Sequence, residues 1–202
     1  MKGILLLNGQ PYDGPIDSSG AVVYCCDGAY EWAKGKVRID KNVGDFDSLG
    51  YMPVPAPEEI YPSEKNFTDG EIALFKMLDA GIDDIEIYGG GGGREDHFLG
   101  NLQLLYAAHR RGAVAKIITR NSVIFVSGGK IELDAYVGLT FSLLPFGECV
   151  HIMDFRGCKY AYPQKISLGE CRGISNIVES SPAYVEVGEG ECALILVNRG
   201  SV

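Results

Sequence analysis

Four short acidic segments in the first half of the chain carry the residues whose chemistry is easiest to infer. They are Asp27-Gly28, Gly44-Asp45-Phe46-Asp47-Ser48, Thr68-Asp69 and Gly92-Gly93-Arg94-Glu95-Asp96-His97. On an extended chain Asp45 and Asp47 project from the same face, with their carboxylates roughly 6–7 Å apart. Two bare anions at that separation repel by on the order of 2–3 kcal/mol at an effective dielectric constant of about 20, and a divalent cation reverses the sign. Oxygen ligands of this kind suit Mg²⁺, which usually bridges to substrate phosphates.

Each segment also has an ordinary structural explanation. An Asp-x-Asp pair can be a solvated loop, and Asp69 can stabilise the start of a helix through the macrodipole. Asp96 can be a helix N-cap, or a further metal ligand or base. Lys65 can be a surface lysine, or a charge that neutralises an oxygen of a metal-bound triphosphate. His97 can be a base or a partly buried helix residue. The occurrence of four such segments in one chain favours chemistry.

The run Gly89 to Gly93 is unusual because five successive glycines cost considerable backbone entropy. Glycines permit close backbone approach to a ligand, here just ahead of a helix N-terminus that attracts anions. The run matches neither G-x-G-x-x-G nor a P-loop, so a nucleotide bound here is held in another way. Arg94 would then clamp a phosphate. A flexible linker is the alternative, but a strand and a long helix flank the run closely.

The elements that must position these residues alternate between apolar runs and amphipathic helical patterns. We expect strands at 4–7, 21–25, 85–88 and 116–119, and helices at 29–36, from 68 to about 78, and at 96–110. Thr68 and Glu71 fit a capping box at the start of the second helix. Such alternation predicts a mostly parallel sheet covered by helices. Asp27 would follow the second strand at the sheet edge where ligands bind.

After about residue 121 the helical period disappears and short β-rich runs take its place. Strands are expected at 123–126, 131–133, 139–144, 149–155, 184–187 and 193–197. The first two are expected to form a hairpin through Ser127-Gly128-Gly129. The chain is therefore predicted to be α/β followed by all-β, with residues 1–121 forming a mostly parallel α/β domain. Residues 122–202 would form an antiparallel sandwich or barrel.

Composition excludes several classes of protein. The 202 residues include 27 acids against 18 Lys and Arg, a net charge of −9, which disfavours binding to nucleic acid. Apolar stretches are too short for a membrane span or a signal peptide. The six cysteines show no CxxC pair and no zinc-finger spacing, which is typical of reduced thiols. We expect a soluble, cytoplasmic protein.

Together these motifs resemble the thiamine pyrophosphokinase family over nearly the whole chain. The residues that carry the resemblance are Asp27-Gly28-Ala29, Gly44-Asp45-Phe46-Asp47-Ser48, Lys65 with Thr68-Asp69, Gly92-Gly93-Arg94-Glu95-Asp96-His97 with Asn101, Ser142-Leu143-Leu144-Pro145 and Gly173-Ile174-Ser175-Asn176. Each motif alone is short, but their order and spacing form a specific set. Two departures are Ala29, where a second glycine is frequent, and Trp32, which is the only tryptophan and lies in the first half.

The resemblance implies a fold and an activity. An N-terminal α/β catalytic domain would bind ATP and Mg²⁺, and a C-terminal antiparallel β-sandwich would help to bind thiamine. The enzyme would transfer pyrophosphate from ATP to the hydroxyethyl group of thiamine, giving thiamine diphosphate and AMP. It would act as a homodimer, with thiamine sites formed between subunits.

The resemblance also assigns residues by position. Those implied for catalysis are Asp45, Asp47, Asp69 and Asp96, of which Asp45, Asp47 and Asp69 would hold Mg²⁺. Those implied for ATP are Asp27, Lys65, Thr68, Arg94 and Asn101, and those implied for the thiamine pyrimidine are Ser175 and Asn176. Either Asp69 or Asp96 would accept the proton of the attacking hydroxyl group. Because Trp32 lies in the first half of the chain, Phe or Tyr residues of the second half would have to pack against the thiamine ring.

Three other functions remain open from the residues themselves. A metal-dependent glycosyltransferase would use Asp45 and Asp47 to hold its ion. A phosphatase would use Asp45 as its nucleophile, but the polar run 40–42 interrupts the apolar strand that such an enzyme needs. A binding or sensor protein would bind thiamine without turning over ATP.

Overall fold

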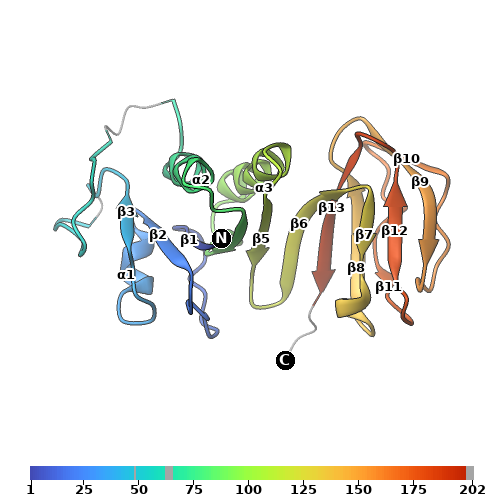
Figure 1. The fold of residues 1–202 in the computed structure, drawn as a ribbon, viewed down its shortest axis with the longest axis horizontal. Helices are drawn as coiled ribbons and strands as arrows, with labels where there is room; N and C mark the ends of the chain where they lie inside the picture. Colours follow the sequence, from blue (N-terminus) through green and yellow to red (C-terminus); the bar gives the residue numbers. More distant parts are fainter. Residues whose placement is uncertain (48, 62–65, 199–202) are drawn as a thin grey trace. The chain divides into compact units, whose positions relative to one another are not determined.

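The first of two compact units contains every acidic segment described above. The computed structural model describes residues 1–47, 49–61 and 66–198, and the chain divides into units of residues 1–120 and 121–202. The elements of the first unit are β1 (Lys2–Leu6), β2 (Val22–Cys26), α1 (Ala29–Ala33), β3 (Lys41–Val43), α2 (Asp69–Asp79), β4 (Asp84–Tyr88), α3 (Glu95–Arg110) and β5 (Val114–Ile118). The strands lie in the order β5-β4-β1-β2-β3, and all of them pair in parallel (Figure 1).

Helices cover both faces of this parallel sheet. Ile4 and Leu6 of β1 pack in one buried cluster with Ala29 of α1. On the opposite face, a Cβ atom at Gly3 would lie only 2.4 Å from the side chain of Met77 in α2. Figure 1 shows α2 and α3 on one side of the sheet and α1 on the other. Strands that are buried on both faces explain why β1 and β2 read as continuous apolar runs.

The second unit consists of two antiparallel sheets. Its elements are β6 (Ser122–Gly128), β7 (Lys130–Glu132), a 3₁₀ turn (Asp134–Tyr136), β8 (Thr140–Pro145), β9 (Cys149–Arg156), β10 (Lys165–Ser167), β11 (Asn176–Ile177), β12 (Tyr184–Val187) and β13 (Cys192–Asn198). One sheet has the order β11-β8-β13-β6 and the other β10-β9-β12-β7. Phe141 and Ile195 of the first sheet share one buried core with Val150 and Val185 of the second.

The structure corrects the expected hairpin between the first two strands of this unit. β6 pairs with β13, whereas β7 pairs with β12 in the other sheet. Gly129, at φ 61°, turns the chain from one sheet into the next. A short glycine turn between two apolar runs is therefore ambiguous, because it can connect two sheets as readily as two paired strands.

Several short elements also depart from the prediction. β3, β10 and β11 are two or three residues long, and their sequences are too short to show a period. Helix α1 ends at Ala33, before the expected residue 36, because Lys34 leaves the helical conformation with ψ 130° and Gly35 follows at φ 81°. No helix in the described part of the chain has both the length and the apolar character that a membrane span requires. No disulfide bond joins any of the six cysteines, all of which lie in the described part of the chain.

Candidate active site

A cavity of about 770 Å³ lies where the strands of the first unit end and two helices begin. The residues that line it include Asn8 after β1, Asp27 after β2 and Asp45 after β3. Helices α2 and α3 and the N-cap of α2 supply the remaining polar positions, which are Thr68, Asp69, Glu71, Asp96, His97, Asn101 and Gln103. The carboxyl ends of parallel strands are where open α/β sheets bind ligands. The cavity therefore brings together residues from all four acidic segments of the sequence.

Asp27 adopts an unusual backbone conformation directly after β2. Its φ is 41°, in the left-handed region that non-glycine residues rarely enter. Its amide donates a hydrogen bond to the carbonyl oxygen of Val43 at 3.0 Å, which fixes it beside the end of β3. Such strain costs of order 1–3 kcal/mol and persists where the surroundings over-determine the conformation.

The Asp-x-Asp segment is bent rather than extended. The buried residue Phe46 has φ 57°, so the expectation that Asp45 and Asp47 project from one face of an extended chain is wrong. The bend is closed by the amide of Asp47, which donates to Oδ1 of Asp45 at 3.3 Å. Carboxylate oxygens of Asp27, Asp45 and Asp47 all lie within 4.8 Å of one another.

Gly44 allows this close approach. It has φ 152°, and a Cβ atom at this position would lie 3.0 Å from Cβ of Asp27 and 3.2 Å from its amide nitrogen. A side chain at residue 44 would therefore push Asp27 away from the Asp-x-Asp loop. Glycine precedes Asp45 here for a steric reason that bears directly on the acidic cluster.

A short strand does precede Asp45. β3 (Lys41–Val43) ends two residues before it, with Asn42 and Val43 buried. The sequence argument against a phosphatase rested on a polar interruption at residues 40–42, and two of these residues, Lys41 and Asn42, lie within the strand. The strand is nonetheless short, and Val43 is its single apolar residue.

The start of α2 presents Asp69 to the cavity. Thr68 is the N-cap, and its side-chain oxygen accepts a hydrogen bond from the amide of Glu71 at 3.1 Å. This confirms the threonine half of the predicted capping box. Asp69 is half-buried and lines the cavity, but among the described residues it does not belong to the cluster of three. Lys65 and Ser48 lie outside the described residues.

The glycine run is a packed loop, so its interpretation as a flexible linker is wrong. The amides of Gly9 and Gln10 donate to the carbonyl oxygens of Gly89 and Gly91 at 2.9 and 3.0 Å. The side-chain amide of Asn101 in α3 donates to the carbonyl oxygen of Gly90 at 2.8 Å. A Cβ atom at Gly89 would lie 2.1 Å from a carbonyl oxygen of the neighbouring strand end. Glycine is therefore required at residue 89, where backbone packs directly against backbone.

Arg94 and Asp96 pair with each other at the start of α3. Arg94 donates to both carboxylate oxygens of Asp96, at 3.1 and 2.6 Å. This pairing lowers the pKa of Asp96 and raises that of Arg94. Of the alternatives that the sequence left open for Asp96, the N-cap role is wrong, because Asp96 is the second residue of the helix and Arg94 occupies the N-cap position. His97 is exposed and lines the cavity.

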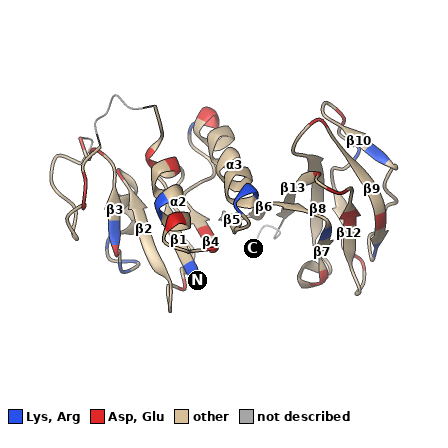
Figure 2. Cartoon of the chain, turned by 45° about the horizontal axis from the view of Figure 1, so that its top comes forward, with Lys and Arg blue, Asp and Glu red and all other residues tan. Residues whose placement is uncertain are grey.

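Figure 2 shows acidic residues around α2 and at the N-terminal end of α3.

Three polar residues that line the cavity were not assigned to the site from the sequence. They are Asn8, Glu71 and Gln103. The signal for Asn8 was available, because it is a polar residue that follows an apolar strand in the same way as Asp27. Gln103 lies on the same face of α3 as other residues that line the cavity. A single sequence gives no signal that this face borders a cavity.

Ser175 and Asn176 lie in the second unit, where they adopt contrasting environments. Ser175 is exposed with φ 61°, and its amide donates to the hydroxyl oxygen of Ser142 at 3.2 Å. Asn176 is buried, and its amide group donates to the carbonyl oxygen of Tyr160 and accepts from the amide of the same residue. Ser175 is thus open to a ligand, whereas Asn176 holds the neighbouring backbone.

The first unit has the form of a ligand-binding α/β protein, with a cavity at the carboxyl ends of parallel strands. Its acidic cluster suits a ligand that arrives with a divalent cation. The family model described as "Thiamin pyrophosphokinase, catalytic domain" matches residues 16–117. The thiamine pyrophosphokinase of Bacillus subtilis (strain 168) is 34% identical over 161 residues, which are 75% of each chain. The chain belongs to the thiamin pyrophosphokinase family, as its motifs predicted.

Solved structures agree with this assignment. The crystal structure of thiamine pyrophosphokinase from Bacillus subtilis matches with a TM-score of 0.80 at 28% identity, covering 100% of this chain and 99% of that one. The Geobacillus thermodenitrificans thiamin pyrophosphokinase matches with a TM-score of 0.81 at 25% identity and the same coverage. The fold common to them combines parallel and antiparallel strands with few helices.

Proposed function

We propose that this chain is an ATP:thiamine diphosphotransferase that makes thiamine diphosphate and AMP. The observation that carries the proposal is the acidic cluster of Asp27, Asp45 and Asp47 beside a cavity in a chain of this family. Under this proposal residues 1–121 are the α/β catalytic domain, and residues 122–202 are an antiparallel β-sandwich that contributes to the thiamine site. Family membership favours this activity over sugar transfer, phosphatase action or simple binding.

The donor set of the acidic cluster fits Mg²⁺. Asp27, Asp45 and Asp47 offer carboxylate oxygens alone, and hard oxygen ligands are those that Mg²⁺ prefers. These three residues would hold the ion, with Asp69 on the same cavity wall. We therefore add Asp27, which the family resemblance assigned to ATP, to the metal-binding residues. A bound Mg²⁺ ion would neutralise charge on the triphosphate and help to align it.

Transfer of pyrophosphate requires mainly positioning and charge neutralisation. The hydroxyl oxygen of thiamine attacks the β-phosphorus of ATP, and the bond between that phosphorus and the α–β bridging oxygen breaks. AMP leaves with the bridging oxygen. Thr68, Arg94 and Asn101 would position the nucleotide, and Lys65 is assigned to the same role from sequence alone.

A carboxylate would accept the proton that the hydroxyl group loses. Of the two candidates, we favour Asp69 over Asp96. The guanidinium of Arg94 lowers the pKa of Asp96, which makes that carboxylate a weaker base. Asp69 is half-buried at the cavity wall, where it would face the attacking group.

The remaining assignments concern thiamine and the assembly. We propose that Ser175 contacts the thiamine pyrimidine directly and that Asn176 supports it by holding the adjacent backbone. We also propose a homodimer, to be tested by light scattering on a size-exclusion column. A cytoplasmic location is supported by six cysteines that form no disulfide bond, the usual state in a reducing compartment.

A coupled assay of AMP release tests the catalytic assignment. The wild type should release AMP only when ATP, Mg²⁺ and thiamine are all present. Asp45→Asn and Asp47→Asn should each lower kcat by about 100-fold or more, because a lost charge contact at a reacting phosphate costs several kcal/mol. Asp84→Asn, an exposed acid at the other end of β4, is the matched control and should retain normal turnover. Near-normal turnover by both cluster variants would contradict the proposal.

A further inference from the structure

A second cluster of metal-ligating side chains lies in the second unit, apart from the acidic cluster of the first. It consists of Cys149, His151 and Glu191, whose sulfur, ring nitrogen and carboxylate oxygen atoms lie within 4.8 Å of one another. Cys149 and Glu191 are half-buried, and His151 is exposed. The group is thus partly shielded from water but still open to an ion from solution.

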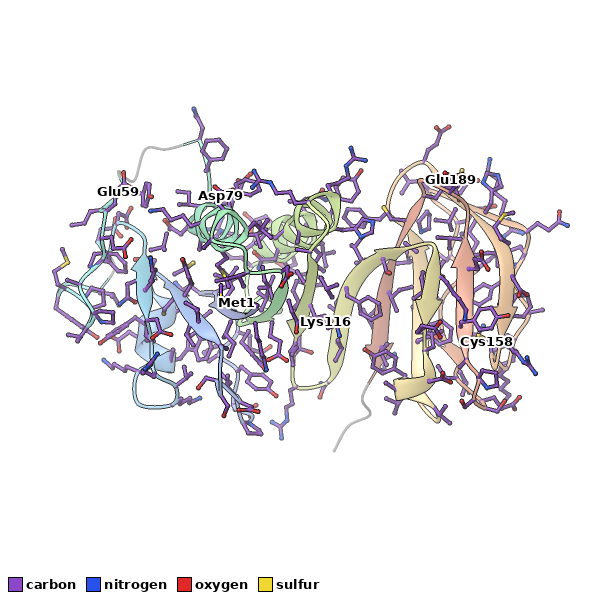
Figure 3. All side chains as sticks on the ribbon, in the orientation of Figure 1. Met1, Glu59, Asp79, Lys116, Cys158 and Glu189 are labelled. Atoms are coloured by element: carbon purple, nitrogen blue, oxygen red, sulfur yellow. The ribbon has the colours of Figure 1, made fainter. Side chains whose placement is uncertain are left out.

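Strand geometry brings these three residues together. Cys149 and His151 are two residues apart on β9, so their side chains project from the same face. Glu191 ends the turn that begins at Gly188 and leads into β13. The amide of Gly188 donates to the carbonyl oxygen of His151 at 3.0 Å, which holds the turn against β9. Figure 3 labels Glu189, which belongs to this turn.

Glu191 is already aligned with His151. One carboxylate oxygen accepts from the amide of His151 at 2.5 Å, and the other lies 2.6 Å from its Nδ1 atom. The carboxylate and the imidazole are therefore held in fixed positions before any ion arrives. Pre-positioned ligands lower the entropy cost of binding.

The donor set selects the kind of ion. A thiolate, an imidazole and a carboxylate are ligands of Zn²⁺, which is commonly held by three protein groups and one water molecule. Mg²⁺ and Ca²⁺ prefer ligand sets made of oxygen atoms alone, so they should bind this cluster only weakly. The acidic cluster in the first unit has the opposite preference. The two clusters should therefore be distinguishable by the ion they take.

We propose that Cys149, His151 and Glu191 form a Zn²⁺-binding site in the second unit. β9 belongs to one antiparallel sheet of this unit, and Glu191 leads directly into β13 of the other (Figure 1). A bound ion thus links the two sheets and stabilises the unit.

Titration of the full-length protein with Co²⁺, a spectroscopic substitute for Zn²⁺, tests the site. A thiolate–Co²⁺ charge-transfer band in the near ultraviolet should appear at one equivalent and disappear when Zn²⁺ is added. The readout requires a sulfur ligand, so ions held by the acidic cluster do not contribute to it. It is also independent of turnover, so its result and that of the AMP assay can differ.

Substitutions test which of the three residues bind the Zn²⁺ ion. Cys149→Ser should abolish the band, and His151→Ala and Glu191→Gln should each weaken Zn²⁺ binding by about 10-fold or more. Cys171→Ser, at an exposed cysteine outside the cluster, is the matched control and should behave as wild type. Zn²⁺ should also raise the Tm of the wild type and of Cys171→Ser but not of Cys149→Ser. Absence of the band in folded wild type, or its persistence in Cys149→Ser, would overturn the proposal.

Discussion

Replacing Asp45 by asparagine should stabilise the metal-free protein while it destroys activity. Asparagine keeps the side-chain oxygen that accepts from the amide of Asp47, so the bend at residues 45–47 is retained. What the substitution removes is one negative charge from a cluster of three. An acidic pair in an ordinary solvated loop would show little change.

The size of the effect follows from the spacing of the carboxylates. Two unit charges 4.8 Å apart repel by about 3.5 kcal/mol at an effective dielectric constant of about 20. Asp47 is exposed and Asp45 half-buried, so solvent and salt screen most of this repulsion. A net gain of about 1 kcal/mol in the free energy of unfolding remains, which corresponds to a rise in Tm of about 2–4 °C for a chain of this size.

Mg²⁺ should reverse the order of stability. An ion present at about ten times its dissociation constant stabilises the wild type by about 1.4 kcal/mol. Asp45→Asn binds the ion more weakly and should gain much less. Differential scanning calorimetry with EDTA and then with Mg²⁺ should therefore show the two Tm values exchanging places. Asp84→Asn, remote from the cluster, should follow the wild type under both conditions.

A specific result would refute this reasoning. If Asp45→Asn is less stable than the wild type in EDTA, the three carboxylates do not repel one another as their spacing indicates. If Mg²⁺ raises the Tm of both proteins equally, the ion binds elsewhere. Either outcome would remove the electrostatic basis for a metal site at Asp27, Asp45 and Asp47.

Other consequences concern the neighbouring loops and the second unit. Arg94 lowers the pKa of Asp96, so their pair stabilises the fold above about pH 4 and loses this contribution as the pH falls through the lowered pKa. Arg94→Ala should accordingly flatten the acid-side decline of the urea midpoint. Gly89→Ala should cost about 2 kcal/mol or more in the free energy of unfolding, because φ is 71° and its Cβ would meet a carbonyl oxygen. Gly100→Ala, where a Cβ meets nothing within 4 Å inside α3, should instead stabilise by up to about 1 kcal/mol, and urea titration of both variants compares them. Asn176→Ala should cost about 1–3 kcal/mol by leaving part-buried backbone groups of Tyr160 unpaired, measured in the same way.

The sequence predicted the parallel half of the fold well, for physical reasons. Strands buried on both faces appear as uninterrupted apolar runs, as in β1 and β2. The helices α2 and α3 are long enough to show a period, and Thr68 marks the start of α2 through its capping hydrogen bond. Elements of two or three residues, such as β3 and β11, carry no period, and their pairing depends on distant partners.

The acidic site was partly predictable. Asp27, Asp45 and Asp47 could be singled out because each follows an expected strand or stands in a motif. The geometry of the three carboxylates relative to one another could not be predicted. It depends on left-handed backbone at Asp27 and Phe46, which local propensity disfavours. The pairing of Arg94 with Asp96 was missed for a related reason, since it depends on where α3 begins.

Mass-spectrometric identification of the products is the most direct test of the proposed activity. The protein is incubated with ATP, Mg²⁺ and thiamine, and all phosphorylated products are quantified over time. The proposal predicts thiamine diphosphate and AMP in equal amounts, both absent when thiamine is omitted. Thiamine monophosphate with ADP, or inorganic phosphate with ADP, would mean attack at the γ-phosphorus and would contradict it. Thiamine binding without any nucleotide product would do the same.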